Sequence, residues 1–205
     1  MSTDGRTRRA ELNREQRRTQ ILERALGVFA EKGYHGASIS DVVKAAGVAR
    51  GTFYLYFDSK EAVFLDLLDD LLSTLRASVG GVDLSEGAPP MEAQLHGIVV
   101  RILRATESNR ALTRIIFREA VGLDASVDAK LREFHDGLGQ WLVGALMLGA
   151  ELGLVRPCDA EVVATCVVGM VRESIHRYVV QRDAPFDADA VAESLVRFAI
   201  EGLRP

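Results

Sequence analysis

The stretch that decides the fold is residues 37–64, ASISDVVKAAGVARGTFYLYFDSKEAVF. Apolar residues recur at helical spacing on both sides of Gly47, and Ser38 precedes Asp41 by three residues, which is a capping signal for a helix N-terminus. Gly47 can adopt a positive φ angle without strain, so it suits the end of the first helix. A second short helix is expected over residues 49–54. The stretch therefore predicts two short helices joined by a tight turn, which is a helix-turn-helix.

A helix-turn-helix can place its second helix in the major groove of DNA while its first helix lies across the backbone. The side chains expected on the second helix suit that position. Arg50 can pair bidentately with guanine, Gly51 lets the backbone approach the DNA, and Thr52 can bond a base edge or a phosphate. Tyr54 and Tyr56 combine an apolar ring with a hydroxyl group that suits a phosphate oxygen. The second helix is therefore predicted to read the DNA.

Three further residues are expected to bind phosphate groups. Lys60 falls in the first turn of the next helix, where the helix dipole disfavours a cation unless a phosphate is bound there. Ser38 and Ser40 open the first short helix and offer hydroxyl and backbone N–H groups. The complete set of predicted DNA contacts is Ser38, Ser40, Arg50, Gly51, Thr52, Tyr54, Tyr56 and Lys60.

The same stretch also has an interpretation without DNA. Short helix pairs with a glycine turn occur in many helical proteins, and an aromatic cluster is more often core than contact surface. Phe53 and Phe57 lie four residues apart, so they share one helix face, which is expected to be core. Tyr54 and Tyr56 point elsewhere. The segment is therefore expected to bury one face and to expose another.

Charge is divided unevenly along the chain. Residues 1–60 carry 11 Lys and Arg against 7 Asp and Glu, whereas residues 61–205 carry 14 against 22. The head is thus at +4 and the rest at −8, which together give the −4 of the whole chain. A basic head suits a polyanion such as DNA, although an ordinary solvated surface would also show this balance.

The composition is that of a soluble globular protein, with 205 residues of which 48% are apolar and 26% charged. No apolar run reaches the roughly 18–20 residues that cross a bilayer, and the basic N-terminal segment lacks the apolar stretch of a secretory signal. Two cysteines are too few for a disulfide framework, so a reducing cytoplasm is expected. Cys166 is expected to be buried, and Cys158, near a helix start, leaves a redox role open.

The alternative classes are an all-helical enzyme and a protein-interaction module without DNA binding. An enzyme needs a nucleophile, a base and a stabilising group that converge on a cleft. The four histidines lie far apart at His35, His96, His135 and His176, and the sequence has no nucleophile-elbow or phosphate-binding glycine motif. We therefore predict no catalytic residue, no metal and no cofactor.

Helical periodicity continues through the rest of the chain and predicts an all-α fold of about nine helices. Residues 1–16 are expected to form a mobile basic arm, and residues 17–64 a helix-turn-helix DNA-binding domain. Residues 65–205 are expected to form a helical body. Within them, the glycine- and proline-rich stretch 80–90 and the turn at 122–124 interrupt the helices.

Residues 17–64, which include the lead-in ILERALGVFAEKGYHGASIS, resemble the DNA-binding domain of TetR-family transcriptional regulators. The run AAGVARGTFYLYFDSKEAVF carries most of this resemblance. It implies that residues 65–205 are a ligand-binding and dimerisation domain. It also implies a homodimer that binds a palindromic operator in double-stranded DNA, most often as a repressor released by a small-molecule effector. Positions that match base-proximal sites are Arg50, Gly51, Thr52 and Tyr54, and those that match phosphate sites are Tyr56 and Lys60. Ser40 falls where some relatives read a base with a longer side chain.

The body is expected to hold an apolar effector pocket, which the resemblance places among its helices. Phe134, Leu138 and Trp141 form one stripe of a long helix over about 125–152, and this stripe is either ordinary core or a pocket wall. The segments IIFREAVGLD and LGAELGLVRP resemble a subgroup of the family with lipid-related or other hydrophobic effectors. The predicted pocket residues are Leu68, Leu72, Leu95, Val99, Leu103, Phe134, Leu138, Trp141, Met170 and Glu173.

The last two helices, over about 159–181 and 187–203, carry small and β-branched residues. With a two-fold copy they would form a four-helix interface, as the resemblance implies, and ordinary intrachain core is the alternative. The predicted interface residues are Val163, Val167, Val171, Val191, Leu195 and Phe198. The helix expected at 60–79 joins head to body. It is predicted to transmit the effect of ligand binding to the head. A ligand that favours another separation of the two heads would lower the DNA affinity.

Overall fold

The computed structural model describes residues 3–119 and 124–204. All regular structure in these residues is helical, in agreement with the all-α prediction. The elements in chain order are α1 (Thr3–Lys32), α2 (Ile39–Ala46), α3 (Arg50–Tyr54), α4 (Lys60–Ser78), α5 (Met91–Ser108), α6 (Arg110–Glu119), α7 (Ala125–Glu151), α8 (Ala160–Ile175), the π-helical segment η1 (His176–Gln181) and α9 (Ala188–Leu203).

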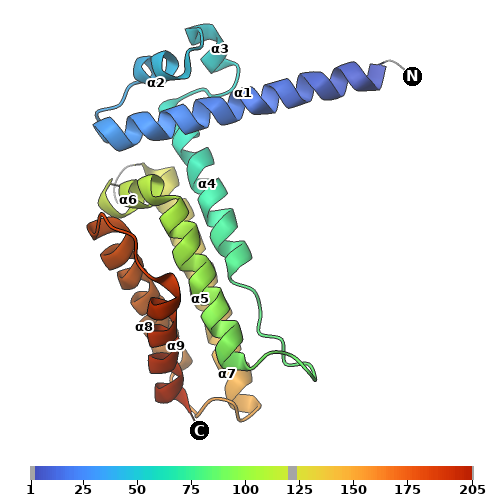
Figure 1. The fold of residues 1–205 in the computed structure, drawn as a ribbon, viewed down its shortest axis with the longest axis vertical. Helices are drawn as coiled ribbons and strands as arrows, with labels where there is room; N and C mark the ends of the chain where they lie inside the picture. The colour runs from blue at the N-terminus through green and yellow to red at the C-terminus, as the bar shows by residue number, and fades with distance from the viewer. Residues whose placement is uncertain (1–2, 120–123, 205) are drawn as a thin grey trace.

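α1 lies across one end of the molecule and separates the head from the body (Figure 1). α2 and α3 lie on one side of α1, and α4 leaves α1 on the other side. α5, α7, α8 and α9 run along the long axis of the molecule toward the C-terminus. The helix-turn-helix is therefore presented at the end that is remote from the C-terminus.

The core of the head is aromatic. Phe29, Phe53 and Phe64 are fully buried, and Phe57 is 3% exposed. The ring centroids of Phe53 and Phe57 lie 5.9 Å apart, so the face that these two residues share is core, as the sequence predicts. Burial of each such side chain stabilises the fold by roughly 1.5–3 kcal/mol. The cluster continues down α4 through residues such as Leu68, which ties the head to the start of the body.

Residues 3–16 differ from the expected mobile arm, because they continue α1 as helix. Residues 7–17 are all exposed, and the first buried residues of α1 are Ile21 and Leu22. The arm therefore lacks the apolar periodicity on which the sequence prediction relied. Its Arg, Glu, Gln and Ala residues favour helix, and extending an existing helix avoids the cost of nucleation.

Two pairs of packed helices dominate the body: α5 packs on α9, and α7 packs on α8. Leu103, Val179 and Ala192 lie at the centre of its core. The helix expected over about 159–181 is divided, since α8 ends at Ile175 and a π-helical turn continues to Gln181. Of the turn expected at 122–124, the first two residues lie outside the described residues. Among the described helices, none is long and apolar enough to cross a membrane.

α6 connects the head to the end of η1, because it packs against both α1 and η1. Two arginines of α6 make the second contact. Arg110 Nη1 donates to the backbone oxygens of Arg182 (2.8 Å) and Val179 (3.3 Å), and Arg114 Nη2 donates to Asp183 Oδ1 at 2.9 Å. The guanidinium of Arg114 holds the pKa of the Asp183 carboxyl below its usual value. α6 is therefore a second connection between body and head beside α4.

Candidate functional site

The local chemistry of the turn agrees with the sequence analysis. Ser38 and Asp41 form a complete capping box at the start of α2: Asp41 N donates to Ser38 Oγ at 3.2 Å, and Ser38 N donates to Asp41 Oδ2 at 3.0 Å. Lys32 Nζ at the end of α1 also binds Asp41. The contact with Lys32, followed by those with Ser38, lowers the pKa of the Asp41 carboxyl. The cap therefore fixes both the start of α2 and its contact with α1.

Gly47 ends α2 in the left-handed conformation, with φ 63° and ψ 33°, which a residue with a Cβ adopts only at a cost. Its N–H donates to the carbonyl oxygen of Lys44 at 3.3 Å, and α3 begins three residues later at Arg50. Gln20 Nε2 on α1 donates to the backbone oxygen of Ala46 at 2.9 Å. The turn is therefore held against α1 by a hydrogen bond.

The outer face of α3 presents the predicted reading residues. Arg50, Gly51 and Tyr54 are exposed and Thr52 is half-buried. Arg50 Nη2 lies 3.5 Å from Tyr54 Oη, and its guanidinium carbon lies 5.9 Å from the centre of that ring. The two side chains therefore lie together on the surface, while Phe53 between them points into the core.

Gly51 has no structural reason within the protein to be glycine. Its φ angle is outside the left-handed region, and a Cβ added there would meet no atom within 4 Å. Glycine in a helix is costly by about 1 kcal/mol relative to alanine. This cost is explained if a partner approaches the backbone of α3 from outside.

Leu55 is a surface residue that the sequence analysis missed. It follows α3 and is 72% exposed, more than any other large apolar residue of the described chain. The signal was present in the spacing, because a residue two positions from both Phe53 and Phe57 points away from the face that they share. An exposed aliphatic side chain beside Tyr54 suits contact with a thymine methyl group.

The three residues predicted to bind phosphate differ in their surroundings. Ser40 is exposed, whereas the hydroxyl of Ser38 is already engaged in the capping box. Lys60 Nζ donates to the backbone oxygens of Tyr34 (2.8 Å) and Ala37 (3.0 Å) and lies 4.3 Å from the centre of the Tyr34 ring. In this structure Lys60 therefore joins α4 to the α1–α2 connection, a role that the sequence analysis did not foresee.

Tyr56 is half-buried and packs against the aromatic core, so less of its ring is free than the sequence analysis expects. Tyr34, whose ring packs against those of Phe29 and Phe64, is 3% exposed, and burial raises the pKa of its phenol far above the usual value. Both tyrosines therefore contribute to the packing that holds α3 and α4 on α1.

A groove of about 840 Å³ lies between the end of α4 and the middle of α7. Phe134, Leu138 and Trp141 line it, as the sequence predicts. Its other lining residues include two arginines, and the guanidinium carbon of Arg76 lies 5.6 Å from the centre of the Phe134 ring. The remaining lining residues are Val79, Ala129, Arg132, Glu133, Asp136, Gly137 and Gln140.

Seven of the ten predicted pocket residues do not line this groove. Leu68, Leu72 and Leu103 are at most 3% exposed inside the two cores. Val99 packs against the body core, and Glu173 is exposed with a carboxylate oxygen 3.5 Å from His176 Nδ1. The other two are Leu95 and Met170, both half-buried. Periodicity marks apolar faces, but it does not distinguish a filled core from an open groove.

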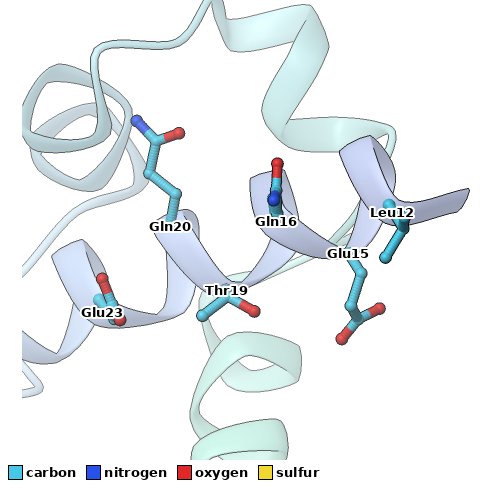
Figure 2. Close-up of a pocket in the computed structure, with 6 residues that line it drawn as sticks. All are labelled: Leu12, Glu15, Gln16, Thr19, Gln20 and Glu23. Atoms are coloured by element: carbon cyan, nitrogen blue, oxygen red, sulfur yellow. The ribbon is translucent and has the colours of Figure 1, made fainter. Parts of the chain in front are cut away.

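A second, shallow hollow of about 350 Å³ lies on α1 and is lined by Leu12, Glu15, Gln16, Thr19, Gln20 and Glu23. Figure 2 shows that Gln16 and Gln20 point toward the side of α1 that carries α2 and α3, whereas Glu15 points the other way. All six residues lie on a single helix, so the hollow has one wall and does not enclose a ligand.

The predicted interface residues differ in their exposure on the last two helices. On α8 the exposed residues include Val162, Thr165, Cys166 and Gly169, and Val162 is 57% exposed. Val171 and Val191 pack against the body core instead, and Val163, Val167 and Leu195 are half-buried. Phe198 on α9 is 70% exposed. Val163, Val167 and Val171 are spaced by four residues on a helix of 3.6 residues per turn. Each one therefore lies further around the helix than the one before, and Val171 faces the core.

The two cysteines are both free. Cys166 is exposed on the outward face of α8, so the expectation that it is buried is wrong. Cys158 is half-buried just before α8. Among the described residues no group of His, Cys, Asp and Glu is arranged to hold a metal ion.

Comparison with known proteins identifies both parts of the chain. The family model described as "Bacterial regulatory proteins, tetR family" matches residues 21–67. The model described as "Tetracyclin repressor-like, C-terminal domain" matches residues 88–203. Together they cover the head and nearly all of the body.

The relatives are regulators of transcription and not enzymes. The fatty acid metabolism regulator protein of Bacillus subtilis is 28% identical over 187 residues, which cover 90% of this chain and 94% of that protein. The HTH-type transcriptional activator FasR of Mycolicibacterium smegmatis is 27% identical over 205 residues, with 97% and 88% covered.

Solved structures show the same fold. The fatty acid degradation regulator FadR from Bacillus halodurans is similar with a TM-score of 0.71 at 28% identity, and 92% of this chain and 96% of that chain are covered. FadR from Bacillus subtilis, solved in complex with stearoyl-CoA, has a TM-score of 0.73 at 24% identity, with 90% and 98% covered. The chain belongs to the TetR family of bacterial DNA-binding transcriptional regulators.

Proposed function

We propose that the protein is a dimeric repressor that binds a palindromic operator through α3 and leaves it when an amphipathic, anionic effector occupies the groove between α4 and α7. The observation that carries the DNA part is the outer face of α3. Arg50, Gly51 and Tyr54 are exposed together there while Phe53 is fully buried beneath them. The cytoplasm, where bacterial DNA lies, is the compartment we propose.

The chemistry of the groove supports a long-chain acyl thioester of coenzyme A as the effector. Phe134, Leu138 and Trp141 supply an apolar wall for a chain, and Arg76 and Arg132 supply cations for phosphate groups. Two relatives described above regulate fatty acid metabolism or degradation, and FadR from Bacillus subtilis was solved with stearoyl-CoA. Glu133 and Asp136 also line the groove, so its charges balance, and the support for this effector is the apolar wall together with the regulators of fatty acid metabolism described above.

The outward face of α8 and α9 supports a dimer. An apolar face with Val162 57% exposed and Phe198 70% exposed is costly in water and suits burial against a second copy. Gly169 on the same face permits close approach of the two helices. Two copies would then present two reading helices to the two half-sites of an operator.

α4 is positioned to carry the effector signal. Its first residue, Lys60, is bonded to the α1–α2 connection of the head, and Arg76 near its end lines the groove. Arg18 on α1 also binds Asp66 on α4. Burial raises the pKa of Asp66 more than Arg18 lowers it. An effector that moves the end of α4 would change the position of the head and thus the DNA affinity.

The test measures DNA binding by the full chain with fluorescence anisotropy. The probe is a duplex recovered by the wild-type protein from a random-sequence library. We expect stearoyl-CoA to lower the affinity at least tenfold and coenzyme A alone to have little effect. Arg76→Ala should reduce this response, whereas Arg104→Ala, which changes an exposed arginine that pairs with Asp189 away from the groove, should not. Equal binding of the duplex with and without stearoyl-CoA would refute the effector class.

A further inference from the structure

The N-terminal half of α1 extends beyond the rest of the head (Figure 1). Residues 7–17 are all exposed, whereas Arg18 is half-buried, binds Asp66 on α4 and lies 5.7 Å from the centre of the Phe57 ring. Residues 3–16 thus form a projecting helical arm. At about 1.5 Å per residue, this arm is about 21 Å long.

The arm carries a small excess of positive charge. Residues 3–16 contain four arginines against one aspartate and two glutamates. Within the described residues, Arg8, Arg9 and Arg14 have no hydrogen bond or ion pair, and all three are exposed. The positive charges of these three side chains are therefore not paired within the described chain, and they can bind an anionic partner.

One face of the arm continues the side of α1 that carries α2 and α3. Gln20 donates to the backbone oxygen of Ala46 at the end of α2, and Gln16 and Gln20 both point toward that side in Figure 2. Arg9 precedes Gln16 by seven residues, which is close to two full turns, so Arg9 lies on the same face. Arg14 lies about 140° away around the helix and one turn before Arg18, which faces α4.

The arm also points away from the proposed dimer face. In Figure 1 α8 and α9 lie on one side of the body, and the N-terminus of α1 projects toward the other. In a dimer formed through α8 and α9, the two arms would therefore point outward along the DNA. A helix of about 21 Å spans about six base pairs at 3.4 Å each.

We propose that residues 3–16 of α1 form a helical DNA-binding arm, whose Arg9 face binds backbone phosphates of the duplex that flanks the two half-sites. This inference rests on the proposed DNA binding and dimer, and it adds a contact outside the helix-turn-helix. Phosphate contacts are independent of base sequence, so the arm increases affinity and extends the footprint without changing which bases are read.

The test uses the duplex recovered by the wild-type protein from a random-sequence library, in a long form with at least ten flanking base pairs on each side and in a form trimmed to the half-sites. On the long duplex, Arg9→Ala should lower affinity about three- to tenfold near physiological salt. It should also reduce the slope of log affinity against log salt by about two, one phosphate for each arm of the dimer. On the trimmed duplex, Arg9→Ala and wild type should bind equally.

Matched variants separate the arm from general charge. Arg14→Ala removes the same charge from the face toward the body and should leave the affinity for the long duplex nearly unchanged. Arg9→Lys keeps the charge and should retain most of the wild-type affinity. Equal effects of Arg9→Ala and Arg14→Ala, or an unchanged salt slope in Arg9→Ala, would overturn the proposed phosphate contact of the arm. The proposed DNA binding by α3 would not be affected by that result. Recovery of no duplex from the library would instead refute the proposed DNA binding.

Discussion

At the scale of single residues, neighbouring positions in and just after α3 alternate between the core and the surface. Phe53 and Phe57 are buried, while Arg50, Tyr54 and Leu55 lie on the surface. The burial of two phenyl rings holds a helix of only five residues, which would not be stable alone in water. The reading surface therefore depends on packing on its opposite side.

Gly51→Ala should separate stability from DNA binding. An added Cβ meets no protein atom within 4 Å, and alanine favours helix, so the free energy of unfolding should rise by about 0.5–1 kcal/mol. If the DNA approaches this backbone closely, affinity should fall about tenfold or more. Urea unfolding and anisotropy measure the two effects. Gly27→Ala on α1, also exposed and without contact to an added Cβ, should stabilise similarly and leave DNA binding unchanged.

Leu55→Ala should weaken DNA binding and leave stability nearly unchanged. The side chain is 72% exposed, so its truncation should alter the free energy of unfolding by less than about 0.5 kcal/mol. Loss of an apolar contact with a thymine methyl group should cost about 1 kcal/mol in affinity for the recovered duplex. Leu84→Ala, in the α4–α5 connection and 53% exposed, is the control. Equal affinities of Leu55→Ala and wild type would show that Leu55 does not touch DNA.

At the scale of elements, short helices are fixed by their ends. α2 has eight residues and is closed by a capping box at Ser38 and by a left-handed Gly47. Lys32 and Ser38 together stabilise the charged form of Asp41. The orientation of α3 follows from this, because the turn at Gly47 leads directly into it.

Ser38→Ala should lower the free energy of unfolding by about 1 kcal/mol, since the N–H of Asp41 loses its side-chain acceptor and retains only the Ser38 carbonyl oxygen. Ser40→Ala is the matched control and should change it by less than about 0.5 kcal/mol. The pKa of Asp41 is lowered in the folded state, so its contribution to stability is present at neutral pH. It should be lost as the pH falls below the usual aspartate value of about 3.9. Acid titration of unfolding should show a smaller loss in Asp41→Asn.

At the scale of the whole molecule, the head and body meet through α1, α4 and α6. α6 adds a connection from η1 to α1 through Arg110 and Arg114, beside the connection along α4. π-Helical turns are rare in proteins as a whole, but those that occur are often found at functional sites. The body therefore has two physical routes by which a change in its packing reaches the reading head.

Phe198→Asp should separate the proposed dimer into monomers. The side chain is 70% exposed on the outward face of α9, so the chain itself should remain folded. A charge buried at a two-fold interface would be repelled by its own copy. Light scattering after gel filtration measures the mass, and DNA affinity should fall at least a hundredfold because one head is lost. Leu84→Asp should stay dimeric; a dimeric Phe198→Asp would place the interface elsewhere.

The sequence alone determined the helix-turn-helix and the split of its aromatic cluster, because both depend on neighbours within a few positions. The Ser38 cap, the Gly47 turn and the common face of Phe53 and Phe57 are local consequences of helix geometry. The tertiary structure decided which apolar faces are filled and which stay open. Residues distant in the chain bury Leu68 and partly bury Val171, while the groove at Trp141 stays open. It also decided that Lys60 meets the carbonyls of Tyr34 and Ala37, because no local pattern shows which segments α4 will meet.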